Sequence, residues 1–317
     1  MEGLKIQGLG YAIAQKTITN EDLSHCVDTS DEWIVQRTGI RTRHITENEN
    51  TSDLAYRAAL KAIEDAHIDK KEIDVILCAT ATPDCVTPSC ASLIQGKLGL
   101  SQSVFAFDLN AACSGFIYGL EVALHLLESY RCILLIGAET LSKIIDWTDR
   151  NTCVLFGDGA GAAILKKSKK KVSFYANSQP DLKGTLQARG RLIRKPLSSD
   201  KQEVGFLSMN GKEVYRFALK EMQKAMEAVK KEDSWDDVDL IIPHQANLRI
   251  IQQVARNIKQ PLSKFYINLD RFGNTSAASI AIALACAKEE KRLKEGMRVL
   301  LVGFGGGLCS GAIYMEW

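Results

Sequence analysis

The feature that most constrains the fold is an order of segments that occurs twice along the chain. In the first half, a strand-like run at 74–84 is followed by a polar turn that opens an apolar helix at 107–124, and then by a second strand-like run at 132–139. The segments 239–249, 267–284 and 299–307 repeat this order in the second half. A repeated strand–helix–strand unit predicts two similar α/β halves packed together, with their central helices between sheets.

The strand-like runs are short, rich in β-branched residues and almost continuously apolar. They lie at 74–82, 131–139, 239–244 and 298–304. Parallel strands covered on both faces have this composition. A lysine-rich run at 166–171 separates the two halves, and we interpret it as a solvated loop. We therefore expect an N-terminal half at 1–171 and a C-terminal half at 172–317.

Charge and cysteine usage narrow the class of protein. The 40 Lys and Arg residues nearly balance the 38 Asp and Glu residues, which does not favour a general nucleic-acid binder. No stretch approaches the roughly 18 apolar residues of a membrane span, and the N-terminus shows no signal-peptide pattern. The nine cysteines are scattered without a CxxC pair, so we expect reduced thiols, no zinc site and a cytoplasmic location.

Cys113 stands at the start of the first central helix, in the segment AACSGFIYGLEVALHLL. The positive end of a helix dipole favours an anion, so we expect thiolate character and nucleophilicity at this sulfur. Gly115 and Gly119 would allow close approach to that first turn. The alternative interpretation is a buried structural cysteine, which is the usual state of a cysteine among apolar residues.

Two further residues hold corresponding places in the second half. His244 ends a predicted buried strand, where ligands of α/β sheets collect. Asn274 precedes the second central helix at the position that corresponds to Cys113, although a plain helix N-cap would also explain it. If the halves are pseudo-symmetric, Cys113 and Asn274 lie at paired helix starts and His244 faces them.

Glycine-rich segments follow two of the predicted strands. The run at 303–307 is not a dinucleotide-binding loop, because position 308 is Leu and the residues that follow resemble a strand. Its backbone N–H groups could instead receive the oxygen of a reacting carbonyl, as an oxyanion hole does. The segment 157–162 also fails the dinucleotide pattern, and we interpret it as a turn between strands.

Six motifs resemble those of the β-ketoacyl-acyl carrier protein synthase III family of the thiolase superfamily. In chain order they are DEWIVQRTGIRTR at 31–43, CSGF at Cys113, GDGAGAA at 157–163, PHQANLRI at 243–250, DRFGNTSAAS at 270–279 and GFGGG at 303–307. The resemblance runs nearly from end to end in the same order. It implies a thiolase-like α/β fold in which two pseudo-duplicated βαβαβ halves form α-β-α-β-α layers.

The resemblance also implies roles for particular residues. The catalytic triad falls on Cys113, His244 and Asn274, and the oxyanion donors are the backbone N–H groups of Cys113 and Gly306. The implied coenzyme A contacts are Trp33, which stacks on adenine, and Arg37, Arg150, Asn247 and Arg249. The implied carrier-protein contacts are Gln245, Ala246, Asn247, Leu248 and Arg249, and the exposed face of the same predicted helix adds Arg256 and Lys259.

Two positions depart from the family pattern. Thr87 stands where the family often has a Phe that reaches into the acyl site of the partner subunit, so we expect Thr87 to leave room for longer primers. After the glycine-rich segment, Cys309-Ser310 stand where the family commonly has a Thr-Trp pair. This difference leaves the catalytic residues intact.

The implied reaction is a decarboxylative Claisen condensation. A short acyl-CoA acylates Cys113, malonyl-acyl carrier protein loses CO2, and His244 with Asn274 stabilise the enolate that attacks the acyl-cysteine. The product is a 3-oxoacyl-acyl carrier protein, the first step of fatty acid biosynthesis. The expected partners are acyl-CoA, malonyl-acyl carrier protein and a second copy of the chain, and no metal or redox cofactor is needed.

Three rival interpretations remain open from the residues alone. The order Cys, His, Asn also occurs in papain-like proteases, but the cysteine motif of those enzymes is absent here. A hydroxymethylglutaryl-CoA synthase or a condensing enzyme of secondary metabolism would share the triad, so only substrates distinguish it. A non-catalytic binding module would not need three catalytic residues.

Overall fold

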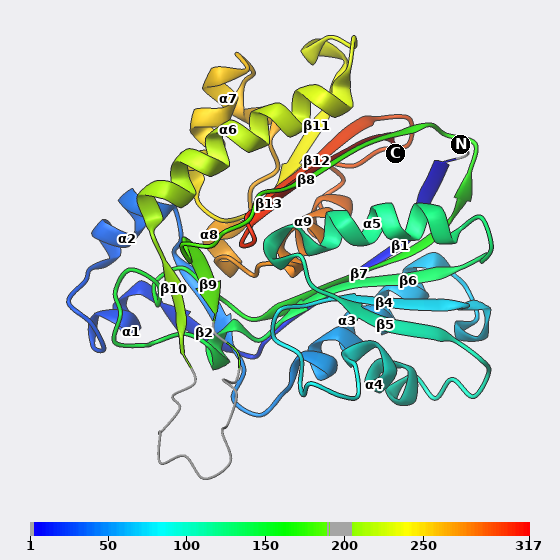
Figure 1. The fold of residues 1–317 in the computed structure, drawn as a ribbon, viewed down its shortest axis with the longest axis horizontal. Helices are drawn as coiled ribbons and strands as arrows, with labels where there is room; N and C mark the ends of the chain where they lie inside the picture. The colour runs from blue at the N-terminus through cyan, green and yellow to red at the C-terminus, as the bar shows by residue number, and fades with distance from the viewer. Residues whose placement is uncertain (1–2, 189, 191–204) are drawn as a thin grey trace.

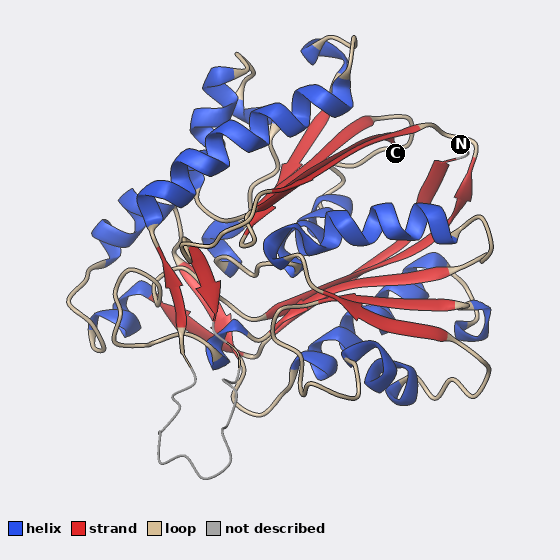
Figure 2. Cartoon of the chain, viewed as in Figure 1, coloured by secondary structure: helices blue, strands red, loops and turns tan. Residues whose placement is uncertain are grey.

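The computed structural model describes residues 3–188, 190 and 205–317. Two β-sheets run through the molecule, with helices between them and over their outer faces (Figure 1). Figure 2, in which helices are blue and strands red, makes the alternation of layers plain. The order α-β-α-β-α and the two similar halves confirm the expected thiolase-like α/β fold.

The first sheet is formed by residues before 169. Its strands are β1 (Gly3–Ile13), β4 (Val75–Ala79), β5 (Phe105–Leu109), β6 (Ile133–Glu139) and β7 (Gly159–Ser168). They are arranged in the order β1-β7-β6-β4-β5, so β5 forms one edge. Strand β4 pairs in parallel with β5 and β6, whereas β7 is antiparallel to both β6 and β1.

The second sheet is formed by residues after 171. Its strands are β8 (Val172–Ser178), β11 (Leu240–Pro243), β12 (Arg298–Gly305) and β13 (Cys309–Glu316). The order is β11-β12-β13-β8. The pair β11–β12 is parallel, like β4–β6, and the remaining pairs are antiparallel. The runs singled out in the sequence therefore form parallel pairs, but both sheets are mixed.

Two central helices fill the space between the sheets: α5 (Gly115–Leu126) and α9 (Ala278–Glu289). Every residue of α9 from Ala278 to Ala287 is buried, as expected for a helix that is apolar on all sides. The core between the sheets joins both helices to both sheets, for example through Ile117, Leu135 and Leu301. This packing places the starts of α5 and α9 near one another.

Outer helices cover the far face of each sheet. Helices α3 (Thr51–Ala66) and α4 (Cys90–Lys97) pack on the first sheet, and α6 (Gly211–Lys230) and α7 (Leu248–Asn257) lie over the second (Figure 1). The smaller elements are α1 (Asn20–Ser24), α2 (Asp31–Thr38), β2 (Lys16–Thr19), β3 (Thr42–Ile45), β9 (Leu186–Ala188), β10 (Leu207–Met209) and α8 (Leu269–Phe272). Short 3-10 turns lie at Lys70–Glu72, Ala112–Ser114, Leu141–Lys143, Trp235–Asp237 and Leu262–Lys264.

Two local predictions were wrong. Most of the segment 157–162, predicted as a turn, belongs to β7, which begins at Gly159. Its small residues suit close packing, not a turn: a side chain at Gly161 would meet the Cβ atom of Ala281 at 2.5 Å. The lysine-rich run is likewise not all loop, because β7 extends to Ser168 and β8 starts at Val172.

Candidate active site

Cys113 lies in the 3-10 turn Ala112–Ser114, directly before α5. The turn is tight, since Ala112 has a φ of 45°, and the side chain of Cys113 is only 8% exposed. Gly305 approaches this turn so closely that a Cβ atom there would lie 2.7 Å from the backbone nitrogen of Cys113. The glycine-rich end of β12 therefore borders the nucleophile, as a role in an oxyanion hole requires.

The protonation state of Cys113 differs from the sequence-based expectation. Burial raises the pKa of its thiol to about 12, and hydrogen bonding to the Ser276 hydroxyl opposes that rise only in part. A helix terminus stabilises a nearby anion by only about 0.3–1 kcal/mol, which does not offset the desolvation of an enclosed sulfur. Burial thus outweighs the helix terminus, and the pKa of the Cys113 thiol lies above its usual value, opposite to the direction expected from the helix dipole.

His244 follows the last residue of β11 and is 1% exposed. Its Nδ1 atom lies 2.6 Å from the Ser279 hydroxyl oxygen on α9, and the ring meets that of Phe304 edge-on at 5.3 Å between centroids. Burial lowers the pKa of the imidazole to about 3, so the ring is neutral at physiological pH. Because Nδ1 is engaged by Ser279, Nε2 is the nitrogen left for chemistry.

Asn274 is held by its backbone and oriented by one side-chain bond. Its backbone N–H donates to the Leu155 carbonyl at 2.8 Å, and its side-chain Oδ1 accepts from the Ser276 backbone N–H at 2.9 Å. The Nδ2 group is thereby left as a donor. Asn274 is not the N-cap of α9, because that helix begins at Ala278, so the correspondence with Cys113 is close but not residue for residue.

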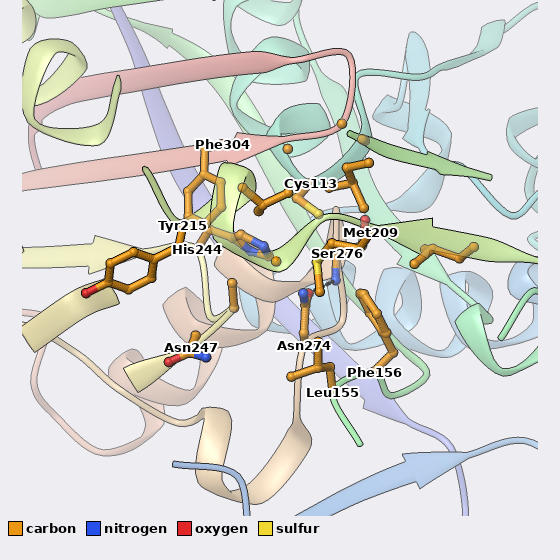
Figure 3. A pocket seen from close by; sticks show the side chains of 18 of the residues that line it. Cys113, Leu155, Phe156, Met209, Tyr215, His244, Asn247, Asn274, Ser276 and Phe304 are labelled. Carbon is orange, nitrogen blue, oxygen red and sulfur yellow. Dashed lines mark hydrogen bonds between the residues drawn. The ribbon is translucent and has the colours of Figure 1, made fainter. Parts of the chain in front are cut away.

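One cavity of about 950 Å³ joins most of the predicted site residues. Its lining includes Cys113, His244, Asn274, Gly306, Trp33, Arg37, Arg150, Ala246, Asn247 and Arg249. In Figure 3 the side chains of Cys113, His244, Asn274 and Ser276 lie around the same space, although they come from three separate segments of the chain. Sequence reasoning brought the first three together through the duplication. Ser276, Ser279 and Phe304 stand inside the DRFGNTSAAS and GFGGG motifs, but sequence reasoning gave them no role.

The mouth of the cavity carries an aromatic ring and several cations. The guanidinium carbons of Arg37 and Arg150 lie 5.5 Å and 5.1 Å from the centroid of the Trp33 ring. The Asn247 side chain donates to the Arg37 carbonyl at 3.1 Å and accepts from the Arg249 backbone N–H at 2.9 Å. This group suits a ligand with an aromatic base and anionic phosphates.

Two cationic residues at the cavity were missed from the sequence. Lys212 and Arg216, both exposed on α6, line the same cavity as Arg249. With Lys220 and Lys224 they recur every fourth residue along the exposed side of α6. That spacing is the signal that could have identified a basic helix face.

The predicted carrier-protein segment divides into buried and exposed residues. Arg249, Arg256 and Lys259 are exposed, and Leu248 is half-buried. Gln245 is only 1% exposed: its side chain donates to the Pro243 and Tyr266 carbonyls and accepts from the Asn268 backbone N–H. The prediction that Gln245 contacts a carrier protein is therefore wrong, because its amide is used to hold the loop after His244.

Thr87 lies away from the other predicted residues. It is exposed in the loop between β4 and α4, and it is not among the residues that line the cavity of its own chain. Any contact of Thr87 with an acyl group would therefore have to be made in a second copy of the chain.

Within residues 3–188, 190 and 205–317, no three His, Cys, Asp or Glu side chains are grouped so that they could hold a metal ion. No helix in these ranges is long and apolar enough to span a membrane.

Comparison with known proteins agrees with this geometry. Residues 107–180 match the family described as 3-oxoacyl-[acyl-carrier-protein (ACP)] synthase III, and residues 230–317 match its C-terminal region. The chain is 44% identical to the beta-ketoacyl-[acyl-carrier-protein] synthase III of Clostridium acetobutylicum, over 100% of this chain and 99% of that protein. The corresponding protein of Fusobacterium nucleatum is 45% identical, with the same coverage. The solved 3-oxoacyl-[acyl-carrier-protein] synthase III of Aquifex aeolicus is 40% identical, with a TM-score of 0.92, over 99% of this chain and 100% of that chain.

Proposed function

This chain belongs to the 3-oxoacyl-[acyl-carrier-protein] synthase III family, and on that premise we propose that Cys113, His244 and Asn274 perform its chemistry. The reaction is a decarboxylative Claisen condensation of a short acyl-CoA with malonyl-acyl carrier protein. It gives a 3-oxoacyl-acyl carrier protein and initiates fatty acid biosynthesis. The observation that carries the assignment of residues is that all three side chains line one cavity together with Gly306.

In the first half-reaction the Cys113 sulfur attacks the thioester carbonyl of acyl-CoA, and the coenzyme A thiolate leaves. The carbonyl oxygen becomes an oxyanion at the tetrahedral stage. The backbone N–H groups of Cys113 and Gly306 receive that oxyanion, which the close approach of Gly305 to the Cys113 turn supports. Donors fixed before the reaction lower this barrier without reorganisation.

In the second half-reaction malonyl-acyl carrier protein loses CO2 and leaves an enolate. The Nε2–H group of neutral His244 and the Nδ2 group of Asn274 donate to the enolate oxygen, each lowering the barrier by ~3 kcal/mol. The required tautomer has Nδ1 unprotonated, and the Ser279 hydroxyl can donate to it. The enolate carbon then attacks the acyl group on Cys113.

Substrates enter through the cationic mouth. Trp33, Arg37, Arg150, Asn247 and Arg249 contact coenzyme A, with the guanidinium groups facing its phosphates. The acidic carrier protein docks over Arg249, Arg256 and Lys259, and the exposed Lys212 and Arg216 extend that surface onto α6.

The proposal also covers the oligomeric state of the protein and its location in the cell. We expect a homodimer formed along β5, an edge strand with Phe105 47% exposed, close to the loop where Val86 is 94% exposed. The nine free cysteines favour a reducing compartment, which supports a cytoplasmic location. The chemistry needs no metal or redox cofactor, because N–H donors carry the charge of both oxyanions.

Intact mass spectrometry tests the proposal directly. Incubation with a panel of acyl-CoAs should add one acyl group to Cys113, and malonyl-acyl carrier protein should then remove it as a 3-oxoacyl product. The relatives do not favour a hydroxymethylglutaryl-CoA synthase or a secondary-metabolism enzyme. Absence of an acyl adduct with every acyl-CoA in the panel would contradict the proposal.

A further inference from the structure

Cys309 lines the active-site cavity but has no part in the steps described above. It is the first residue of β13 and is 4% exposed. In the hairpin formed by β12 and β13 it pairs with Gly305, so the residues Gly306, Gly307 and Leu308 form the connecting loop. Cys309 therefore stands at the base of the loop that supplies the proposed oxyanion donor Gly306.

The Cys309 sulfur lies between the two segments that supply the proposed oxyanion donors. It is 3.0 Å from the Gly306 carbonyl oxygen and also 3.0 Å from the Ala111 carbonyl oxygen. Gly306 carries one of the two donors, and Ala111 stands two residues before Cys113, whose backbone N–H is the other. A single side chain thus contacts both sides of the proposed oxyanion hole.

The thiol carries one hydrogen, and the two carbonyls differ in their need for it. The Ala111 carbonyl already accepts from the Ser114 backbone N–H at 3.1 Å. Within the part of the chain that the structure describes, the Gly306 carbonyl has no hydrogen-bond donor other than the Cys309 thiol. Burial raises the pKa of this thiol, so the sulfur keeps its hydrogen at neutral pH and can donate it to Gly306.

Gly306 needs such an anchor because it is the middle residue of three consecutive glycines, whose backbones can adopt many conformations. Its neighbours are held by the backbone: Gly305 belongs to β12, and the Gly307 carbonyl accepts from the Asp181 backbone N–H at 3.0 Å. The Gly306 N–H lies between the fixed Gly305 and its own carbonyl. Once the Cys309 thiol holds that carbonyl, little freedom is left to the N–H, and a donor fixed before the reaction lowers the barrier most.

We infer that Cys309 is a positioning residue of the oxyanion hole, whose thiol holds the Gly306 carbonyl so that the Gly306 N–H is directed at the thioester oxygen while Cys113 is acylated. The inference rests on the proposed function, because it takes the N–H groups of Cys113 and Gly306 as the donors. In this role Cys309 forms no bond to the substrate. The enolate oxygen of the second half-reaction is received by His244 and Asn274, so decarboxylation does not depend on Cys309.

Two variants that differ by one hydroxyl group test this role. Cys309→Ser keeps a donor at the position of the thiol, whereas Cys309→Ala removes it, and both side chains are smaller than cysteine. Single-turnover loading with a short acyl-CoA, quenched at set times and followed by intact mass spectrometry, gives the rate of acylation of Cys113. Loss of an oxyanion donor costs about a hundredfold or more, so a donor that is kept but poorly directed should slow loading by Cys309→Ala about tenfold. Cys309→Ser should load at close to the rate of the unmodified protein.

Two other readouts separate positioning from a general loss of structure. The acyl-CoA concentration that gives the half-maximal loading rate should be unchanged in Cys309→Ala, because the residues around Trp33 at the mouth are intact. Release of radiolabelled CO2 from malonyl-acyl carrier protein should also be unchanged, which would show that the variant is folded. Cys132→Ala is the matched control: this thiol is also buried, but it lies in the core beneath α3 and α4 and does not line the cavity, so its loss should not affect loading.

The outcomes separate the inference from the proposed function. Unchanged loading by Cys309→Ala, or loading by Cys309→Ser that is as slow as that by Cys309→Ala, would overturn the role of the thiol. Equal losses of loading and of CO2 release in Cys309→Ala would also overturn it, because they would indicate that Cys309 only fills space. Failure of the unmodified protein to load Cys113 would contradict the proposed function itself.

Discussion

The Nδ1 atom of His244 lies 2.6 Å from the hydroxyl oxygen of Ser279, and this contact joins β11 to the central helix α9 inside the site. It determines which imidazole nitrogen faces the cavity. A hydroxyl that donates to Nδ1 stabilises the tautomer with hydrogen on Nε2, the one required for donation to an enolate.

Removal of this hydroxyl should therefore weaken decarboxylation. Ser279→Ala takes away one hydrogen bond worth about 1 kcal/mol, so malonyl decarboxylation should fall roughly fivefold to tenfold while acyl loading changes less. Ser310→Ala is the control, because that buried hydroxyl has no hydrogen-bond partner among the described residues. Equal losses in both variants would assign the effect to packing.

The low pKa of His244 gives a second prediction. With histidine labelled for NMR, the ring signal of His244, assigned with His244→Ala, should not titrate between pH 5 and pH 8. The unfolded chain binds a proton at this residue near pH 6.5 and the folded chain only near pH 3, so this residue should lower the free energy of unfolding as pH falls below 6.5. A midpoint near pH 6.5 would contradict the burial of a neutral ring.

Reversal of one surface charge tests the carrier-protein surface. Arg256 is exposed and lies outside the lining of the main cavity, so Arg256→Glu should raise the KM for malonyl-acyl carrier protein about fivefold at low salt and leave that for acyl-CoA unchanged. The difference should shrink as salt rises. Lys169→Glu makes the same charge change between β7 and β8 and should have no effect. If Arg256→Glu and the unmodified protein had the same KM for malonyl-acyl carrier protein at every salt concentration, this surface would be excluded as the docking site.

Substitution of Thr87 tests whether a second copy of the chain helps to select the acyl primer. A Thr in place of a Phe leaves room for extra methylenes, each worth about 0.8 kcal/mol on burial, so the unmodified protein should use primers longer than acetyl. Thr87→Phe should shift the ratio of kcat/KM values towards acetyl-CoA. Strict acetyl selectivity before mutation would show that neighbouring side chains already fill the space.

Much of the fold could be predicted because its signals are local. The apolar runs that became β4, β6, β11 and β12 and the apolar helices α5 and α9 are visible without tertiary information. The antiparallel strands were harder to predict from the sequence. The Gly and Ala residues of β7 are also typical of a turn, and only the close packing of α9 explains why this strand has small side chains.

The sequence allowed the catalytic residues to be identified, but it did not allow the pKa values of their side chains to be predicted. Chain position and the family motifs placed Cys113, His244 and Asn274 together, but the pKa of each ionisable group depends on enclosure by both halves. Ser279 matters through its contact with His244, which lies 35 residues away along the chain, and no spacing rule reveals that contact. Burial of Gln245 is another consequence of tertiary packing.

The two half-reactions are divided between Cys113, which carries the acyl group, and the pair formed by His244 and Asn274, which stabilises the enolate. Asn274→Ala should still be acylated by acyl-CoA but should lose most decarboxylation, because its Nδ2 donor serves only the enolate. Cys113→Ala should load no acyl group and should still decarboxylate malonyl thioester, because both enolate donors remain.

The measurement is release of radiolabelled CO2 from malonyl-acyl carrier protein beside covalent acyl loading, in the unmodified protein, Cys113→Ala and Asn274→Ala. Cys113→Ala should release CO2 without acyl loading, and Asn274→Ala should load acyl groups with CO2 release reduced about a hundredfold. Normal CO2 release by Asn274→Ala, or acyl loading by Cys113→Ala, would contradict it.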